Sequence, residues 1–297
     1  MLGQLIEAGA NVFRLNMSHS KHDWVREVVF RIRRKAAELK ANVAILFDLQ
    51  GPSIRTGDLM EPYHLKKGDT VEIRLGTAKP ELPFSTTVNY DGLLQDVQAG
   101  HTMVVDNGGI LMRIAEVRPD RLICDVLTEG VFGSRRHINL PGVALRLPAL
   151  TEKDLADLAV AVECETDYVA MSFVRDAAHI AQLREHIDNL GGKAQIVAKI
   201  EDQQAVRHID DIILAADVIM VARGDLGIEV SIEELPIIQR RIVRRFARSD
   251  NAHANPVKLP DGRFFKLRQK IVQRLNINLH MCLLMAQSHF IQASTFL

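Results

Sequence analysis

Short apolar strand patterns alternate with amphipathic helix patterns along two stretches of the chain, and this alternation constrains the fold more than any other feature. Helices are expected over 21–40, where apolar residues recur every four positions, over 203–216, and from Ser231 to about Arg245. Residues 151–154 resemble a capping box that opens another helix. Strands that are joined through helices pair in parallel, which predicts an α/β fold. A (β/α)8 barrel and an open doubly wound sheet both fit five such strands. The strand patterns lie at residues 11–16, 43–47, 168–173, 195–200 and 217–222.

The pattern changes between residues 58 and 137. There, glycine and proline separate short runs of alternating apolar and polar residues, which is typical of an all-β unit. Because α/β patterns lie on both sides, we expect a domain inserted into a loop. The predicted organisation is a first α/β part (1–57), the inserted domain (58–137), a second α/β part (138–248) and a last segment (249–297) without such alternation.

Composition and missing motifs exclude several classes of protein. The chain has 37 basic and 37 acidic residues, and this balance argues against a nucleic-acid-binding protein. Its three cysteines form no CxxC pair, so neither a zinc site nor a disulfide framework is expected. No apolar run is long enough to span a membrane, and the N-terminus does not resemble a secretion signal, so we expect a cytoplasmic protein. Neither GxxxxGK[ST] nor GxGxxG occurs.

Polar residues gather where four of the predicted strands end. Since the carboxyl ends of parallel strands meet at one edge of a sheet, we expect one shared site there. Glu201 and Asp225 suit a hard divalent cation, and nearby lysine and arginine side chains suit the anionic oxygens of a phosphate or carboxylate. This mixture favours phosphoryl transfer or stabilisation of an enolate. His19 and His22 lie beside the first strand and are expected to be solvated.

These residues lie in motifs that resemble those of the pyruvate kinases. The resemblance runs from about residue 2 to about residue 247 and implies a partial (β/α)8 TIM barrel, with five of eight strands recognisable and an inserted all-β lid domain. It also implies the glycolytic transfer of a phosphoryl group from phosphoenolpyruvate to ADP, giving pyruvate and ATP, with Mg2+ and K+. The matching stretches are 6–19, 48–57, 138–142, 147–154, 171–175, 199–201 and 219–227.

The resemblance implies two metal sites. Glu201 and Asp225 would be the Mg2+ ligands. The K+ ligands would come from the first two strand ends, namely Asn16, Ser18, Asp48 and the backbone carbonyl of Leu49.

It also implies the contacts to the substrates. Lys199 would stabilise the transferring phosphoryl group and the developing enolate, together with Arg14 and Arg55. Lys199 and Arg14, with the amides of Gly224 and Asp225, would bind phosphoenolpyruvate, the amides holding its carboxylate at a helix N-terminus. The nucleotide contacts would be Arg14, Asn16, His19, Arg55 and either Arg135 or Arg136.

The sequence departs from the family pattern at its two ends. The first barrel strand would precede Met1, and the residues after Arg248 do not match the family's seventh strand. The eighth strand and the C-terminal domain are also missing, so we expect an incomplete barrel that lacks much of the surface through which the family forms homotetramers. Smaller departures occur at Ser20, Ser53, Asn107 and His137.

Three interpretations follow. The first is a truncated pyruvate kinase that keeps its magnesium and phosphate positions. The second, favoured by the missing seventh strand, is an inactive remnant that pairs with an intact subunit. The third is another magnesium-dependent enolate enzyme, such as a lyase or aldolase. The Glu201 and Asp225 pair alone allows it, whereas the inserted lid and the predicted K+ cluster argue against it.

Overall fold

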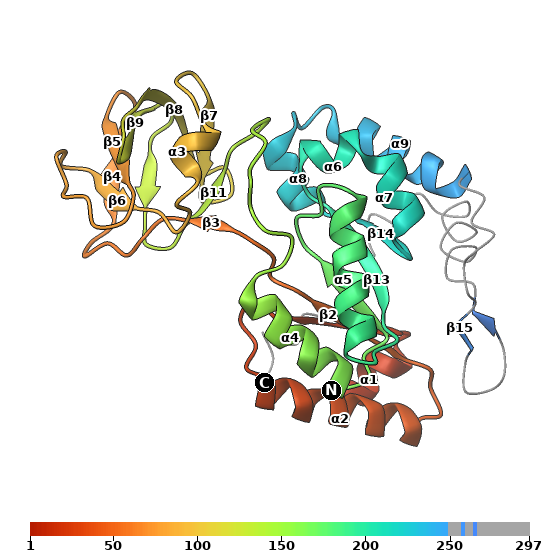
Figure 1. Ribbon diagram of the computed structural model, residues 1–297. Helices are drawn as coiled ribbons and strands as arrows, with labels where there is room; N and C mark the ends of the chain where they lie inside the picture. The colour runs from red at the N-terminus through yellow and green to blue at the C-terminus, as the bar shows by residue number, and fades with distance from the viewer. Residues whose placement is uncertain (249–256, 259–263, 266–297) are drawn as a thin grey trace.

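The computed structural model describes residues 1–248 and the two short strands β15 (Val257–Lys258) and β16 (Phe264–Phe265), which pair with each other. Within residues 1–248, five parallel strands form one sheet in the order β1-β2-β12-β13-β14, shown in Figure 1. This confirms the expected α/β fold. The strands are β1 (Val12–Asn16), β2 (Ala44–Asp48), β12 (Tyr168–Met171), β13 (Gln195–Ile200) and β14 (Val218–Val221).

Helices cover one face of this sheet. Their buried apolar side chains, such as Ile32 of α2 and Leu183 of α5, pack against alternate strand residues such as Phe47 and Ile196. The helices are α1 (Leu2–Glu7), α2 (His22–Glu38), α4 (Glu152–Glu163), α5 (Ala177–Asn189), α6 (Gln203–Arg207), α7 (Ile209–Ala215), α8 (Arg223–Glu229) and α9 (Leu235–Arg248).

A smaller apolar cluster lies on the opposite face of the sheet, around Leu46, Tyr168, Ala170 and Val197. Side chains two positions apart in a strand share a face. The residues that follow Leu46 and Val197 on this face are therefore Asp48 and Lys199, at the carboxyl ends of β2 and β13. The inner face of the sheet thus changes from apolar to charged toward one edge, which is where the candidate site forms.

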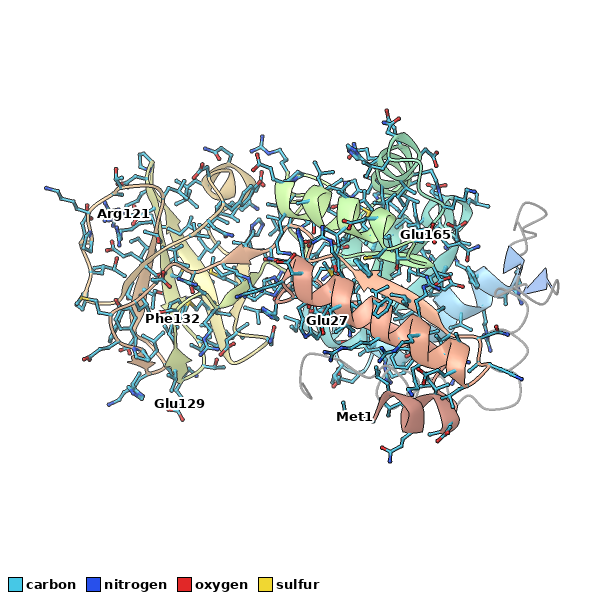
Figure 2. The ribbon with its side chains drawn as sticks, turned by 90° about the horizontal axis from the view of Figure 1, so that it is seen from below. Met1, Glu27, Arg121, Glu129, Phe132 and Glu165 are labelled. Carbon is cyan, nitrogen blue, oxygen red and sulfur yellow. The ribbon has the colours of Figure 1, made fainter. Side chains whose placement is uncertain are left out.

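The inserted all-β unit lies between β2 and α4. Its seven-stranded mixed sheet has the order β3-β11-β7-β8-β9-β5-β6, and β4 pairs with β10. Figure 2 shows this lid, with Arg121, Glu129 and Phe132, as a body beside the sheet-and-helix unit that carries Glu27 and Glu165. The elements are β3 (Ile54–Arg55), β4 (Tyr63–Leu65), β5 (Thr70–Arg74), β6 (Ser85–Thr87), α3 (Leu93–Asp96), β7 (Thr102–Val105), β8 (Ile110–Val117), β9 (Arg121–Val126), β10 (Gly130–Phe132) and β11 (His137–Asn139).

The lid has its own apolar core, which includes Ile73, Met103, Ile114 and Phe132. Strands β3 and β11 pair at the junction with the parallel sheet, so the two chain segments that enter and leave the lid run side by side. This pairing places the lid residues Arg55 and His137 opposite each other, next to the charged edge of the sheet.

Two helix predictions differ from the structure. The single helix expected over 203–216 is two helices, because His208 ends α6 and begins α7 with a backbone outside the α-helical region. The helix expected from Ser231 begins at Leu235, since residues 231–234 form a turn in which the Glu234 amide donates to the Ser231 carbonyl. Among the helices of residues 1–248, none has the length and apolar character needed to cross a membrane.

Candidate active site

Lys199 lies at the centre of the charged edge. Its Nζ is 2.8 Å from Glu201 Oε1 and 3.2 Å from Asp48 Oδ1, and it donates a hydrogen bond of 2.7 Å to Ser172 Oγ. Burial acts to lower the pKa of Lys199, but the charges of Glu201 and Asp48 outweigh it and raise the pKa above its usual value. The structure therefore holds a buried ammonium group in its charged form.

Arg14 joins this cluster from the neighbouring strand. Its Nε donates to Asp48 Oδ2 at 2.6 Å, while residues 12–16 of β1 pair in register with 44–48 of β2. Asp48 therefore faces two cations, yet its Oδ1 accepts no hydrogen bond from the described residues, because the Lys199 ammonium is close without being aligned. A buried carboxylate oxygen with free acceptor capacity is available to a further cation.

Ser172 connects two of the predicted site residues. Its hydroxyl accepts from Lys199 and donates to the carbonyl oxygen of Leu49 at 2.7 Å. Gly51 lies directly against it: a Cβ added at Gly51, whose φ is +69°, would be 3.0 Å from the Ser172 Cβ. The loops after β2 and β12 are therefore closely packed, and a larger residue at position 51 would crowd Ser172 as well as strain the backbone.

Glu201 is fully enclosed beside Lys199. Its Oε2 accepts from the Phe173 amide at 2.6 Å. Burial raises the pKa of Glu201 to about 7; Lys199 opposes this shift and the charge of Asp225 adds to it. Asp225, in the first turn of α8, therefore lies close enough to Glu201 for the two negative charges to interact.

The lid contributes to the same edge. The His137 ring lies 5.7 Å from the Phe173 ring. Burial lowers the pKa of His137, the Arg55 charge lowers it further and the Asp225 charge opposes the shift. Arg55 and Asp225, predicted from different motifs, therefore both act electrostatically on one lid histidine. The Arg55 guanidinium also donates to the Arg135 carbonyl at 3.1 Å.

Other predicted residues lie outside this cluster. Arg136 is exposed on the lid and pairs with Asp106 at 3.3 Å, and Arg135 pairs with Asp58 at 2.7 Å. His19 is exposed in the loop after β1. Gly224 is exposed in the first turn of α8.

His22 is not simply solvated, as its sequence position suggested. Its Nε2 lies 2.7 Å from Oδ1 of Asp157, a carboxylate with no exposed surface. No local pattern indicates this partner, which lies 135 residues away in α4.

The oxygen donors fit the two metals that the resemblance implies. Asp48 Oδ1 has free acceptor capacity, and Asn16 lies opposite Asp48 in the β1–β2 register, so the oxygen donors there would suit a monovalent cation. Glu201 and Asp225 supply hard carboxylate oxygens for Mg2+, which usually takes its remaining ligands from water and substrate. Among the described residues no group of three or more His, Cys, Asp or Glu gathers as a metal site.

Sequence reasoning missed three residues of this edge. Ser172 lies within a matched motif, but a serine after a strand gives no signal of its own. Phe173 has a positive φ of 53°, an unusual backbone for a bulky residue, and its amide binds Glu201. In the sequence His137 stands out only as a departure from the family pattern, and in the structure its ring lies against that of Phe173.

Comparison with known proteins identifies the family of this chain. The family model "Pyruvate kinase, barrel domain" matches residues 1–256. Plastidial pyruvate kinase 2 of Arabidopsis thaliana is 39% identical over 246 residues, which cover 82% of this chain and 42% of that protein. The pyruvate kinase of Clostridium perfringens is 38% identical over 247 residues, covering 82% and 52%. That of Mycobacterium tuberculosis H37Rv is 37% identical over 241 residues, covering 81% and 51%.

The chain thus spans about half the length of the curated relatives that it matches. The matched region contains the whole cluster around Lys199 and the inserted lid. On this evidence of sequence and fold, the chain belongs to the pyruvate kinase family.

Proposed function

We propose that this chain transfers a phosphoryl group from phosphoenolpyruvate to ADP, giving pyruvate and ATP, as a glycolytic phosphotransferase. One observation carries the proposal: the buried Lys199 ammonium contacts Glu201 and Asp48, with Arg14 and Asp225 beside these carboxylates. Cations and carboxylates in fixed positions at one sheet edge suit a reaction in which negative charge moves between oxygens.

Lys199 is the group that we assign to the reacting atoms. The carboxylates around it keep it charged, and Ser172 fixes the direction of its Nζ. A fixed ammonium group stabilises the phosphoryl oxygens during transfer and the enolate oxygen that remains. Since its partners are already in place, little reorganisation is needed when charge develops.

The two metals would be held by oxygen donors around this lysine. Mg2+ would be held by Glu201 and Asp225, and K+ by the Asn16, Ser18 and Asp48 side chains with the Leu49 carbonyl. When bound, these ions neutralise negative charge on the substrate oxygens.

Arginines and backbone amides complete the proposed substrate contacts. Arg14 would bind the phosphoryl group, and Arg55, on the lid strand β3, the nucleotide phosphates. The Gly224 and Asp225 amides would bind the substrate carboxylate. The nucleotide assignments to Asn16, His19 and Arg136 stay predictions, as does homo-oligomeric assembly. A cytoplasmic location also stays a prediction, because the relatives include plastid and chloroplast enzymes.

The test is a coupled assay of pyruvate formation from phosphoenolpyruvate and ADP with Mg2+ and K+. We expect a rate that depends on both ions and that falls by about 100-fold or more in Asp225→Ala. Lys199→Met should reduce the rate at least as much. A purified, folded chain whose rate equals that of Asp225→Ala would contradict the proposal.

An inactive chain that pairs with an intact subunit is the alternative interpretation. A melting curve distinguishes a catalytic chain from an inactive one. A catalytic chain should melt at a higher temperature when Mg2+ and phosphoenolpyruvate are added together, since both bind the folded state. A cooperative transition that neither ligand shifts would favour the alternative.

A further inference from the structure

Helix α4 contacts both of the loops that carry the proposed K+ ligands. Its capping residue Thr151 is bound by Asp154, a carboxylate with no exposed surface. The other oxygen of that carboxylate, Oδ1, accepts from the Gly51 amide at 3.0 Å. The start of α4 therefore holds the loop after β2, two residues beyond Leu49.

The second contact reaches the loop after β1. Lys153 Nζ donates to the carbonyl of Met17 at 2.7 Å and to Asp157 Oδ2 at 2.6 Å. Asp157 Oδ1 in turn lies 2.7 Å from His22 Nε2, at the first residue of α2. The loop from Met17 to His22 is thus tied to α4 at both ends.

The Met17 carbonyl matters because of the peptide unit to which it belongs. A peptide group is planar, with its C=O and N–H on opposite sides. The carbonyl of the unit joining Met17 and Ser18 is held by Lys153, and its N–H, which belongs to Ser18, donates to Asn16 Oδ1 at 3.1 Å. Fixing one side of this unit therefore fixes the amide that orients the Asn16 side chain.

Charge is balanced in this arrangement. An isolated ammonium group near a cation site would repel the cation. Asp157 lies against Lys153 and has no exposed surface, so its negative charge offsets that of the lysine. The lysine can thus hold the backbone without adding net positive charge beside Asn16.

We propose that Lys153 is a positioning residue for the monovalent-cation site, and that Asp157 and His22 hold it in place. It acts through the Met17–Ser18 peptide group on Asn16 and Ser18, and it does not bind the ion. The inference rests on the proposed function, because Asn16 and Ser18 are K+ ligands only under that proposal.

The experiment compares Lys153→Met with Lys35→Met, a control that also removes a lysine bound to a carboxylate, in this case that of Glu38 on α2. Ion binding is measured as the K+ concentration that half-saturates the shift in melting temperature, and again by NMR with Tl+ as the probe. Amide exchange of Ser18 is measured without any metal.

Lys153→Met should raise the half-saturating K+ concentration about tenfold, as the loss of a group that supports metal ligands commonly does. Exchange of the Ser18 amide should become faster by a similar factor, while half-saturation by Mg2+ changes less than about twofold. Lys35→Met should change none of these. His22→Ala, which leaves Lys153 and Asp157 paired, should give a smaller shift in the same direction and serves where Lys153→Met is poorly folded.

The outcomes are distinct. If the wild-type chain binds K+ and Lys153→Met binds it equally well, the positioning role is wrong and the proposed K+ site stands. If the wild-type chain responds to neither K+ nor Tl+, the proposed site fails and the inference fails with it. Unchanged Ser18 exchange in Lys153→Met also overturns the inference.

Discussion

Lys199 and Glu201 are two residues apart at the end of β13, and their side chains form a buried ion pair with Nζ and Oε1 2.8 Å apart. Alternation along the strand puts both side chains on the inner face of the sheet. Asp48 reaches the same lysine from β2, two strands away in the sheet. One cation thus serves two buried carboxylates, and its removal affects both.

Lys199→Met should therefore lower the free energy of unfolding by about 3–5 kcal/mol at pH 8, because it leaves the buried Glu201 carboxylate without a cation and leaves Asp48 with Arg14 alone. The loss should be smaller at pH 5.5. The pKa of Glu201 is already raised to about 7 by burial, and without Lys199 it rises further, so Glu201 takes up a proton and the unpaired charge disappears.

Urea denaturation at the two pH values measures this effect. The double variant Lys199→Met/Glu201→Gln is the control, since it also removes the unpaired charge of Glu201 and should recover part of the loss at pH 8. Equal losses for the single and double variants would show that the ion pair does not couple the two residues.

Gly51→Ala should destabilise the chain by more than its backbone conformation alone requires. The added Cβ would lie 3.0 Å from the Ser172 Cβ and 3.1 Å from the Ser172 carbonyl oxygen. Gly191 is a matched control, with a φ of +71° against +69° and nothing within 4 Å of an added Cβ.

Both alanine variants lose about 1 kcal/mol to the left-handed backbone, and crowding should cost Gly51→Ala about 1–3 kcal/mol more. Chemical denaturation of the two variants gives the difference. If Gly191→Ala is destabilised as much as Gly51→Ala, the packing of Gly51 on Ser172 does not contribute to the free energy of unfolding.

Glu229 should make stability fall as the pH rises. Burial raises the pKa of Glu229 to about 7; the hydrogen bond from Asn139 opposes this shift and the Asp202 charge adds to it. The Asn139 Nδ2 lies 3.3 Å from Glu229 Oε1, and Asn139 Oδ1 has no hydrogen-bond partner among the described residues. A protonated Glu229 has a proton to donate in this buried polar pair, whereas the carboxylate has none.

The sign follows from the raised pKa. The folded state holds the proton more tightly than the unfolded state, so the stabilisation is complete below the ordinary pKa of 4.5 and is lost as the pH rises through about 7. Relative to Glu229→Gln, which does not titrate, the wild-type chain should lose on the order of 2–3 kcal/mol between pH 4.5 and pH 8.

Denaturation curves at several pH values test this, with Glu233→Gln as a control for the change in net charge at a nearby exposed glutamate. A constant difference between wild type and Glu229→Gln across the pH range would mean that Glu229 is ionised throughout.

The fold was predictable where local patterns decide it. The run 195–200, whose apolar residues Ile196, Val197, Ala198 and Ile200 predict a strand, forms β13 over the same residues. The capping box at Thr151 is also present as expected, because its two hydrogen bonds lie within four residues. The helix expected over 203–216 failed at His208, whose Nδ1 lies 3.0 Å from the carbonyl of Arg175, a contact that no local pattern encodes.

In the candidate site, too, local patterns predict only the relations between residues that are close in the sequence. Alternation along strands predicted that Lys199 and Glu201 share a face, and they do. The hydroxyl of Ser172 binds residues 27 and 123 positions away, and His22 binds a carboxylate 135 positions away, so only the folded chain shows these partners. The roles assigned to the site residues stay predictions, since positions alone do not test them.

Ser172→Ala should reduce function much more than stability. The serine hydroxyl fixes Lys199 Nζ and the Leu49 carbonyl at once, and its loss removes two hydrogen bonds worth about 1 kcal/mol each. We expect kcat to fall by about 10–100-fold and the half-saturating K+ concentration to rise, as for other groups that orient metal ligands. Ser85→Ala is the matched control, because Ser85 is a buried serine of the lid whose hydroxyl accepts from Arg74 at 2.7 Å. That variant should lose similar stability and keep its response to K+, whereas equal kinetic effects of the two substitutions would place Ser172 among the merely structural serines.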